Sequence, residues 1–84
     1  MSLRTKVIDA VLDDHIGQNN IVSRREVIDF FPNYSNSYAG VILSNSEMNR
    51  DHSPNYQSFT TRIGRGQNRI HQDILNMRQK ERGE

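Results

Sequence analysis

The hydrophobic residues at the start of the chain recur at helical spacing. Leu3, Val7 and Val11 follow one another at intervals of four residues, and Ile16 continues the same stripe. Apolar residues at this spacing line one face of a helix that packs against a core. A glycine follows the last of them, and glycine is a common helix stop. The pattern therefore predicts a first helix over roughly residues 3–16.

A second helix is predicted after a short β-favouring pair, Ile21 and Val22. Ser23 and Glu26 are spaced as a capping box, in which each side chain accepts a hydrogen bond from a free backbone N–H of the helix start. Pro32 ends this helix, because the residue before a proline avoids helical geometry. The sequence therefore predicts a small strand followed directly by a helix.

A third helix is predicted over about residues 35–46. Ser35 or Asn36 can cap its start, since the side-chain oxygens of both residue types accept hydrogen bonds from free N–H groups there. The residues whose spacing turns them toward the core are Tyr38 or Ala39, with Ile42 and Leu43. Two helices joined by a short turn form the helix-turn-helix arrangement.

A β-hairpin is predicted after the third helix. Phe59, Thr61 and Ile63 alternate with other residues, which places them on one face of a strand. Gly64 and Gly66 follow, and both can adopt the positive φ that a hairpin turn requires. The chain then returns in a short second strand.

The last apolar stripe consists of Ile70, Ile74 and Met77, again at helical spacing. It predicts a further C-terminal helix. Its apolar face, with Ile74 and Met77, serves either as core or as a contact for a second copy or a protein partner. Residues 1–78 are expected to form one domain, and residues 79–84 a charged, disordered tail.

The order of these elements is that of a winged helix-turn-helix, an α+β fold. It comprises three helices, a small antiparallel sheet with a β-hairpin wing, and the C-terminal helix. The pair Ile21-Val22 lies where such folds place the strand that joins the hairpin as a three-stranded sheet.

Composition limits what this fold can do. The chain has 84 residues, enough for one small domain, and no cysteine, so disulfides and thiolate metal sites are excluded. No apolar run approaches the roughly 18 residues that a membrane-spanning helix needs. We expect a cytoplasmic protein without a membrane segment.

Nothing in the sequence indicates catalysis, a metal or a cofactor. The histidines His15, His52 and His71 are too scattered for a local metal motif. Asp13 and Asp14 are neighbours, but adjacent residues of a helix point in different directions. We therefore expect a binding protein and not an enzyme.

Positive charge gathers in the second half of the chain. The net charge is only +1, but residues 35–71 carry four arginines against two acidic residues. Three of them, Arg62, Arg65 and Arg69, lie in or beside the hairpin turn. The near-neutral total argues against strong non-specific binding of polyanions, while the distribution predicts a local basic patch.

The stretch 34–70 resembles a small winged-helix family of bacterial and phage proteins that often lies near, or is fused to, restriction and modification enzymes. The matching residues are Tyr34-Ser35, His52, Tyr56, Phe59, Arg62-Ile63-Gly64-Arg65-Gly66 and Ile70. The family pattern has an aromatic residue where this chain has Asn68. The resemblance implies a domain that binds double-stranded DNA, such as a transcription regulator or a defence-system accessory, without nuclease or methyltransferase activity.

The third helix is the candidate recognition helix, because an α-helix fits the major groove and its first turns face the base edges. Asn36, Ser37 and Asn45 can hydrogen-bond bases or phosphates, Val41 can contact a thymine methyl group, and Ser35 at the helix start suits a phosphate. The alternative is a solvated helix surface, since this helix carries no arginine or lysine.

The arginines are the other candidate DNA contacts. Arg65 at the wing tip can enter a minor groove, with Arg62 and Arg69 on the flanking phosphates. Arg24 and Arg25 open the second helix, where they oppose the helix dipole, and can meet the DNA backbone. The cation-free third helix also keeps open a winged helix that contacts a protein partner and no DNA.

Overall fold

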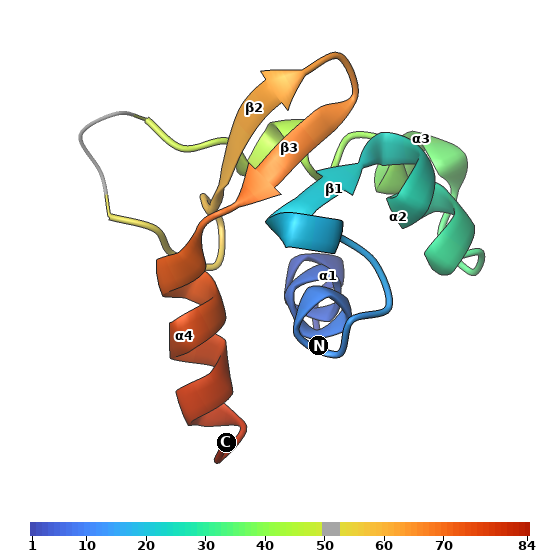
Figure 1. Cartoon of the computed structure of the whole chain (residues 1–84). Helices are drawn as coiled ribbons and strands as arrows, with labels where there is room; N and C mark the ends of the chain where they lie inside the picture. Colours follow the sequence, from blue (N-terminus) through green and yellow to red (C-terminus); the bar gives the residue numbers. More distant parts are fainter. Residues whose placement is uncertain (50–52) are drawn as a thin grey trace.

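The part of the chain that the structure describes, residues 1–49 and 53–84, contains four α-helices and one three-stranded antiparallel sheet (Figure 1). The structure is a computed structural model. The elements follow in the order α1 (Leu3–Leu12), the short 3₁₀ helix η1 (Gln18–Asn20), β1 (Ile21–Ser23), α2 (Arg24–Phe30), α3 (Asn36–Ala39), the 3₁₀ helix η2 (Ser44–Ser46), β2 (Thr60–Gly64), β3 (Gln67–Ile70) and α4 (Gln72–Glu81). The predicted α+β class, the small antiparallel sheet and the C-terminal helix are confirmed.

The first helix ends at Leu12, four residues before the predicted end. The amide of His15 donates to the carbonyl of Ala10 and the amide of Asp14 donates to that of Val11. This pair of bonds is the Schellman arrangement, which needs a left-handed residue just past the helix, and Asp14 has φ +60°. Aspartate tolerates that conformation, so no glycine was needed to stop the helix.

The second helix begins as predicted. The Ser23 hydroxyl accepts from the Glu26 amide at 3.0 Å, and the Glu26 carboxylate accepts from the Ser23 amide at 2.9 Å. The other Glu26 carboxylate oxygen accepts from the Gly17 amide at 3.2 Å. The capping box therefore also fastens the loop that follows α1.

The sheet has the strand order β1-β3-β2, so β1 joins the hairpin as predicted. Val22 pairs with Asn68 and Ile21 with Arg69 on one side of β3, and Thr60 pairs with Ile70 on the other. The hairpin tip and the free end of α4 point in opposite directions (Figure 1).

Burial along this stretch does not follow the alternation of Phe59, Thr61 and Ile63. Phe59 is buried, but Thr60 comes next and is buried as well, whereas Thr61 and Ile63 are exposed. The register shifts between Arg62 and Gly64, so the alternation does not continue to the turn. Of the two turn glycines, only Gly66 has a positive φ, +67°.

The prediction of a continuous third helix over residues 35–46 was wrong. Only one helical turn, α3, forms; turns at residues 40–43 and the 3₁₀ helix η2 follow it. Ser35 is the cap, and its hydroxyl accepts from the backbone amide of Tyr38. Ala39 is buried and Tyr38 is 47% exposed, which settles the alternative between these two residues.

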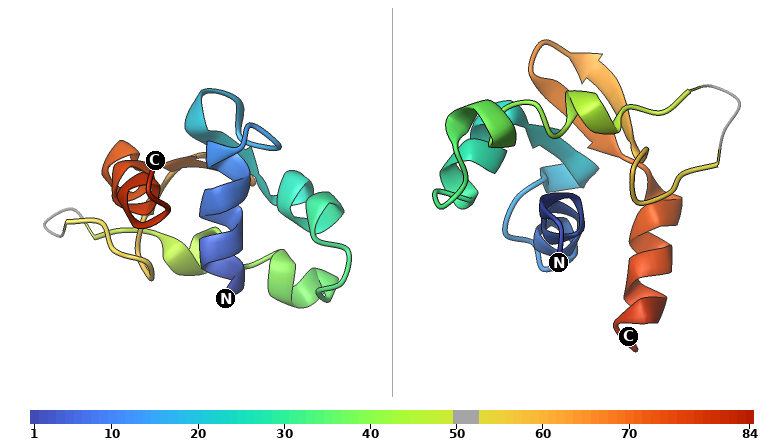
Figure 2. Two further views of the ribbon diagram at one scale, coloured as in Figure 1. Left: turned by 90° about the horizontal axis from the view of Figure 1, so that it is seen from below. Right: turned by 180° about the vertical axis from the view of Figure 1, so that it is seen from behind.

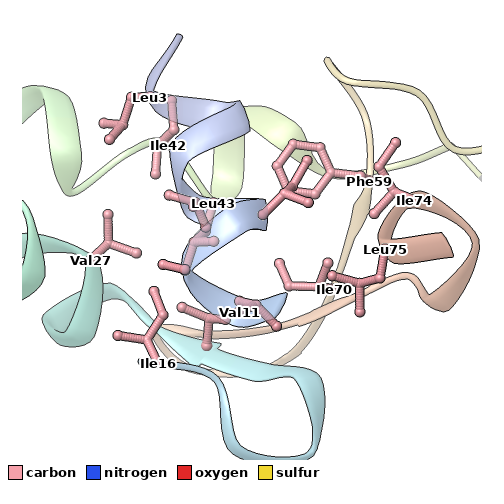
Figure 3. Close-up of a cluster of buried hydrophobic side chains, with 14 of the residues drawn as sticks. Leu3, Val11, Ile16, Val27, Ile42, Leu43, Phe59, Ile70, Ile74 and Leu75 are labelled. Carbon is pink, nitrogen blue, oxygen red and sulfur yellow. The ribbon is translucent and has the colours of Figure 1, made fainter. Parts of the chain in front are cut away.

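The core is a single cluster with α1 at its centre (Figure 3). Around α1 it gathers side chains from α2, residues 39–43, the hairpin and α4, among them Val27, Ile42, Phe59 and Ile70. Among residues 1–49 and 53–84, one cluster gathers these buried side chains, as expected for a chain of this length.

The C-terminal helix packs on α1. Ile74 is fully buried and Leu75 nearly so, whereas Met77 is 43% exposed. Of the two predicted roles, core or contact with a partner, Ile74 therefore has that of a core residue, and Met77 alone of the pair is exposed. Arg78 donates from Nε to Asp9 at 2.7 Å, and this hydrogen bond raises the pKa of the Arg78 guanidinium.

The last residues differ from the predicted disordered tail. Helix α4 continues to Glu81, and Arg82 donates to the carboxylate of Asp13 at 2.7 Å. In the described ranges, no helix is both long enough and apolar enough to cross a membrane.

The placement of α4 predicts opposite outcomes for two apolar residues on one helix. Ile74→Ala should lower the free energy of unfolding by about 2–5 kcal/mol, because it leaves a cavity in the core. Met77→Ala should change it by less than about 0.5 kcal/mol, because that side chain faces solvent. Urea denaturation measures both values, and equal losses would contradict the orientation of α4.

Candidate nucleic-acid interface

Residues 40–43 lead from α3 to η2, which lies against the β2–β3 hairpin (Figure 2, right), and their carbonyl groups bond to side chains. All four carbonyls accept hydrogen bonds from side chains: Gly40 from Arg24, Val41 from Ser44, Ile42 from Ser46, and Leu43 from Thr60. Side-chain donors of this kind compete with the backbone N–H groups that would continue a helix. Two of the four carbonyls also accept from backbone amides, Val41 from Asn45 and Leu43 from Ser46, and the chain continues in turns and the 3₁₀ helix η2 instead of a regular α-helix.

The contact with the hairpin is a buried polar network. The Thr60 hydroxyl donates to the Leu43 carbonyl at 2.9 Å, and the Asn68 amide donates to the Thr60 hydroxyl and to the Glu47 carboxylate, both at 3.1 Å. Thr60 is fully buried and Asn68 is 4% exposed. Asn68 occupies the position where the resemblance predicts an aromatic residue, and hydrogen bonds replace apolar packing there.

A cleft of about 290 Å³ opens between this segment and the hairpin. Its lining comes from α2, residues 40–47 and both strands of the hairpin, and consists of Arg24, Gly40, Leu43, Ser44, Glu47, Arg62, Gly66 and Asn68. Two guanidinium groups and one carboxylate thus share one opening on the surface. Two of the predicted DNA-contact residues, Arg24 and Arg62, meet here although they are far apart in the sequence.

Arg24 holds the two walls of the cleft together. Its backbone amide donates to the Gly66 carbonyl at 2.8 Å, and its Nε donates to the Gly40 carbonyl at 3.1 Å. Gly40 leaves room for the guanidinium, since a Cβ atom there would lie 2.6 Å from an Arg24 side-chain nitrogen. Arg24 is therefore structural as well as a cation at the cleft.

The other predicted arginines point in different directions. Arg62 pairs with Asn68 in the register, so both lie on the cleft face, whereas Arg69 is exposed and the pleat turns it to the opposite face. Arg65 is exposed at the hairpin tip. Arg25 pairs with an aspartate one turn further along α2 and lines a different hollow. The basic patch is therefore narrower than the sequence suggested.

Residues 35–46, predicted as the third helix, form α3, the turns after it and η2, and are called the third segment from here on. The polar contacts predicted for this segment remain available in part. Asn36 and Ser37 are exposed on α3, Asn45 is exposed within η2, and Val41 is 43% exposed. The Ser35 hydroxyl accepts its capping bond from the Tyr38 amide and keeps its own proton to donate. These side chains extend along one segment, but the break in the helix means that they do not form one helical face.

Two cations beside this segment were missed at the sequence level. Arg4 of α1 donates from Nε to the Ser46 hydroxyl at 2.8 Å and from a terminal nitrogen to the Asn45 carbonyl at 3.2 Å. Lys6 donates to the Tyr34 hydroxyl at 2.9 Å. Positive charge near the third segment thus comes from α1 and α2. The sequence signal for Arg4 was its position in the first turn of the predicted first helix, where a positive charge opposes the helix dipole.

The scattered histidines that the structure describes have local roles. His71 caps α4, because its Nδ1 accepts from the Asp73 amide at 3.1 Å, and the His15 ring stacks on Phe30. His52, one of the residues of the resemblance, lies outside the described residues.

In comparisons with protein-family models, with curated proteins and with solved structures, nothing matches this chain.

Two glycines beside the cleft test its geometry. Gly40→Ala should lower the free energy of unfolding by about 1–3 kcal/mol, because the added carbon meets the Arg24 guanidinium and the Asn36 carbonyl, each at 2.6 Å. Gly64→Ala is the matched control, since its new carbon would lie no closer than 3.5 Å to a neighbouring side chain.

Thermal or urea unfolding of the two variants gives the comparison. Gly64→Ala should leave stability unchanged or slightly raised, because the loss of a glycine restricts the unfolded chain. A Gly40→Ala variant as stable as the natural chain would contradict the close approach of Arg24.

Proposed function

We propose that this chain is a winged-helix domain that binds double-stranded DNA, with the β2–β3 hairpin as its wing. The observation that carries the proposal is the meeting of Arg24 and Arg62 in one cleft between the third segment and the hairpin. Cations at this place suit the phosphates of a DNA strand that passes between helix and wing.

The arrangement of elements supports the proposal. Helices α2 and α3 follow one another through a short turn, and β1 joins the hairpin in one sheet. Arg65 at the hairpin tip and Arg62 on its cleft face have no ion-pair partner among residues 1–49 and 53–84. Their charge is therefore available to phosphates. In the proposed complex, Arg65 at the exposed hairpin tip reaches a groove of the DNA.

Sequence reading by the third segment is modest in this proposal. Asn36 and Ser37 can donate to bases or phosphates, and the exposed Val41 suits a thymine methyl group. The helix is a single turn long, so few side chains reach base edges at once. With a net charge of +1, affinity depends on the local cations of the cleft and the wing. The resemblance suggests a transcription regulator or a defence-system accessory.

A second candidate function is contact with a protein, and one observation favours it. A row of aromatic rings extends from the loop after α1 through the end of α2 and the α2–α3 turn to α3, with neighbouring centroids 5.0–6.3 Å apart: His15, Phe30, Phe31, Tyr34 and Tyr38. Phe30 is 41% exposed and Tyr38 47%. Exposed aromatic residues are enriched at protein interfaces. This aromatic surface is the candidate protein contact in place of the face of α4, because Ile74 on that face is buried.

Replacement of two cleft and wing arginines tests DNA binding. Arg62→Ala with Arg65→Ala should weaken binding of a mixed-sequence duplex, because fewer phosphates are neutralised. The slope of log affinity against log salt should fall by about 0.9 for each phosphate that these arginines neutralise in the natural chain. Fluorescence anisotropy of a labelled duplex over a range of salt concentrations measures both quantities.

Arg25→Ala is the matched control, because that arginine pairs with Asp29 and lines another hollow. It should leave the salt slope unchanged, and all three proteins should melt at similar temperatures. DNA binding would be contradicted if the natural chain showed no salt-sensitive binding to any duplex at low ionic strength. Equal effects of Arg25→Ala and the double change would place the contact elsewhere.

A further inference from the structure

We propose that Glu47 determines specificity at this interface by accepting a hydrogen bond from the N4 amino group of a cytosine. The inference rests on the proposed function, since it needs a DNA duplex in the cleft. It goes further in naming one side chain and one base, and in giving a reason for an acidic residue inside a basic site.

Glu47 is half-buried and lines the cleft together with Arg24 and Arg62. One of its carboxylate oxygens, Oε2, accepts from the Asn68 amide at 3.1 Å. Among the described residues, no arginine, lysine or histidine nitrogen lies within the 4.0 Å of an ion pair to this carboxylate. The carboxylate is therefore held in place by a neutral donor, and its charge is not cancelled by a direct ion pair.

The buried network orients this carboxylate. Asn68 is 4% exposed and also donates to the fully buried Thr60, whose hydroxyl is in turn fixed on the Leu43 carbonyl. A satisfied polar network of this kind restricts the rotamers of its members. An apolar residue at position 68 would offer Glu47 no hydrogen-bond donor. A network that holds a carboxylate at the cleft suits a recognition role.

Electrostatics limits what this carboxylate can favour. It repels phosphates, so it reduces binding to any DNA backbone that enters the cleft. The opposing gain must come from a hydrogen-bond donor, and in the major groove the donors are the amino groups of cytosine and adenine. Adenine carries the acceptor N7 beside its amino group, which a carboxylate also repels. Cytosine carries no such acceptor, and guanine and thymine offer acceptors only.

The test compares Glu47→Gln with the natural chain in a binding selection. A pool of duplexes with randomised positions is equilibrated with each protein, and the bound fraction is sequenced. The natural chain should prefer cytosine at one position by roughly fivefold to a hundredfold, the range of one good base contact. Glu47→Gln should lose that preference and bind mixed-sequence duplex more tightly, because a repulsive charge is gone.

Two further variants keep the result decisive. Asp73→Asn removes the same charge from α4, where the carboxylate is exposed and outside the cleft, and should change neither quantity. Glu47→Asp keeps the charge but shortens the side chain, so it should weaken the cytosine preference without tighter general binding. If the Glu47→Gln variant does not melt cooperatively and is therefore not folded, the Glu47→Asp variant serves as the test in its place.

The outcomes separate this inference from the proposed function. If the natural chain binds no duplex, the proposed function itself fails. If it binds duplex but shows no cytosine preference, or if Glu47→Gln or Glu47→Asp retains the full preference, the role of Glu47 is overturned while DNA binding stands. Loss of the preference in Asp73→Asn as well would also overturn it.

Discussion

The hydrogen bond from the Thr60 hydroxyl to the Leu43 carbonyl lies at the centre of the site. It is buried, and both of its partners make a further hydrogen bond: the Leu43 carbonyl accepts from the Ser46 amide, and the Thr60 hydroxyl accepts from the Asn68 amide, both at 3.1 Å. It turns the chain after α3 back along the hairpin, and it anchors the network through which Asn68 holds Glu47. Together with two backbone hydrogen bonds, from the Phe59 amide to the Ser46 carbonyl at 2.8 Å and from the Met48 amide to the Thr60 carbonyl at 2.9 Å, it fixes residues 43–48 against the hairpin.

The position of the third segment also decides which positive charges lie beside it. The third segment carries no arginine or lysine, and its free carbonyl groups receive cations from other elements, Arg24 from α2 and Arg4 from α1. Each arginine satisfies the backbone and remains a charge beside the segment. Arginine suits both tasks at once, because its guanidinium has five N–H donors and rarely uses all of them in one contact. A segment without cations is in this way compatible with a binding site for DNA.

Local sequence rules predicted much of the fold. The capping box at Ser23, the strand at Ile21 and the helix through Ile74 rest on spacing within a few residues, and all three formed. The third helix ends at Ala39, and the carbonyl groups that follow bond to side chains that include Thr60, which lies 17 positions from Leu43 in the sequence. Helix propensity cannot register such a distant contact.

The candidate site was predictable only in part for the same reason. A cluster of arginines beside a glycine turn identified the hairpin, but the pleat separates Arg62 from Arg69, and the turn of α2 separates Arg24 from Arg25. Glu47 carried no sequence signal as a functional residue. Its position in the cleft follows from Asn68, which departs from the aromatic pattern of the resembling family, and that departure was the available clue.

Chemical-shift mapping tests the central claim most directly. A ¹⁵N-labelled sample is titrated with a short mixed-sequence duplex at low salt, and the amide shifts are followed residue by residue. Binding in the cleft predicts that the largest changes fall on residues 40–47 and 62–68, with the outer face of α4 unaffected. Changes confined to the aromatic surface around Phe30, or the absence of any change, would contradict the assignment of this cleft as a DNA site.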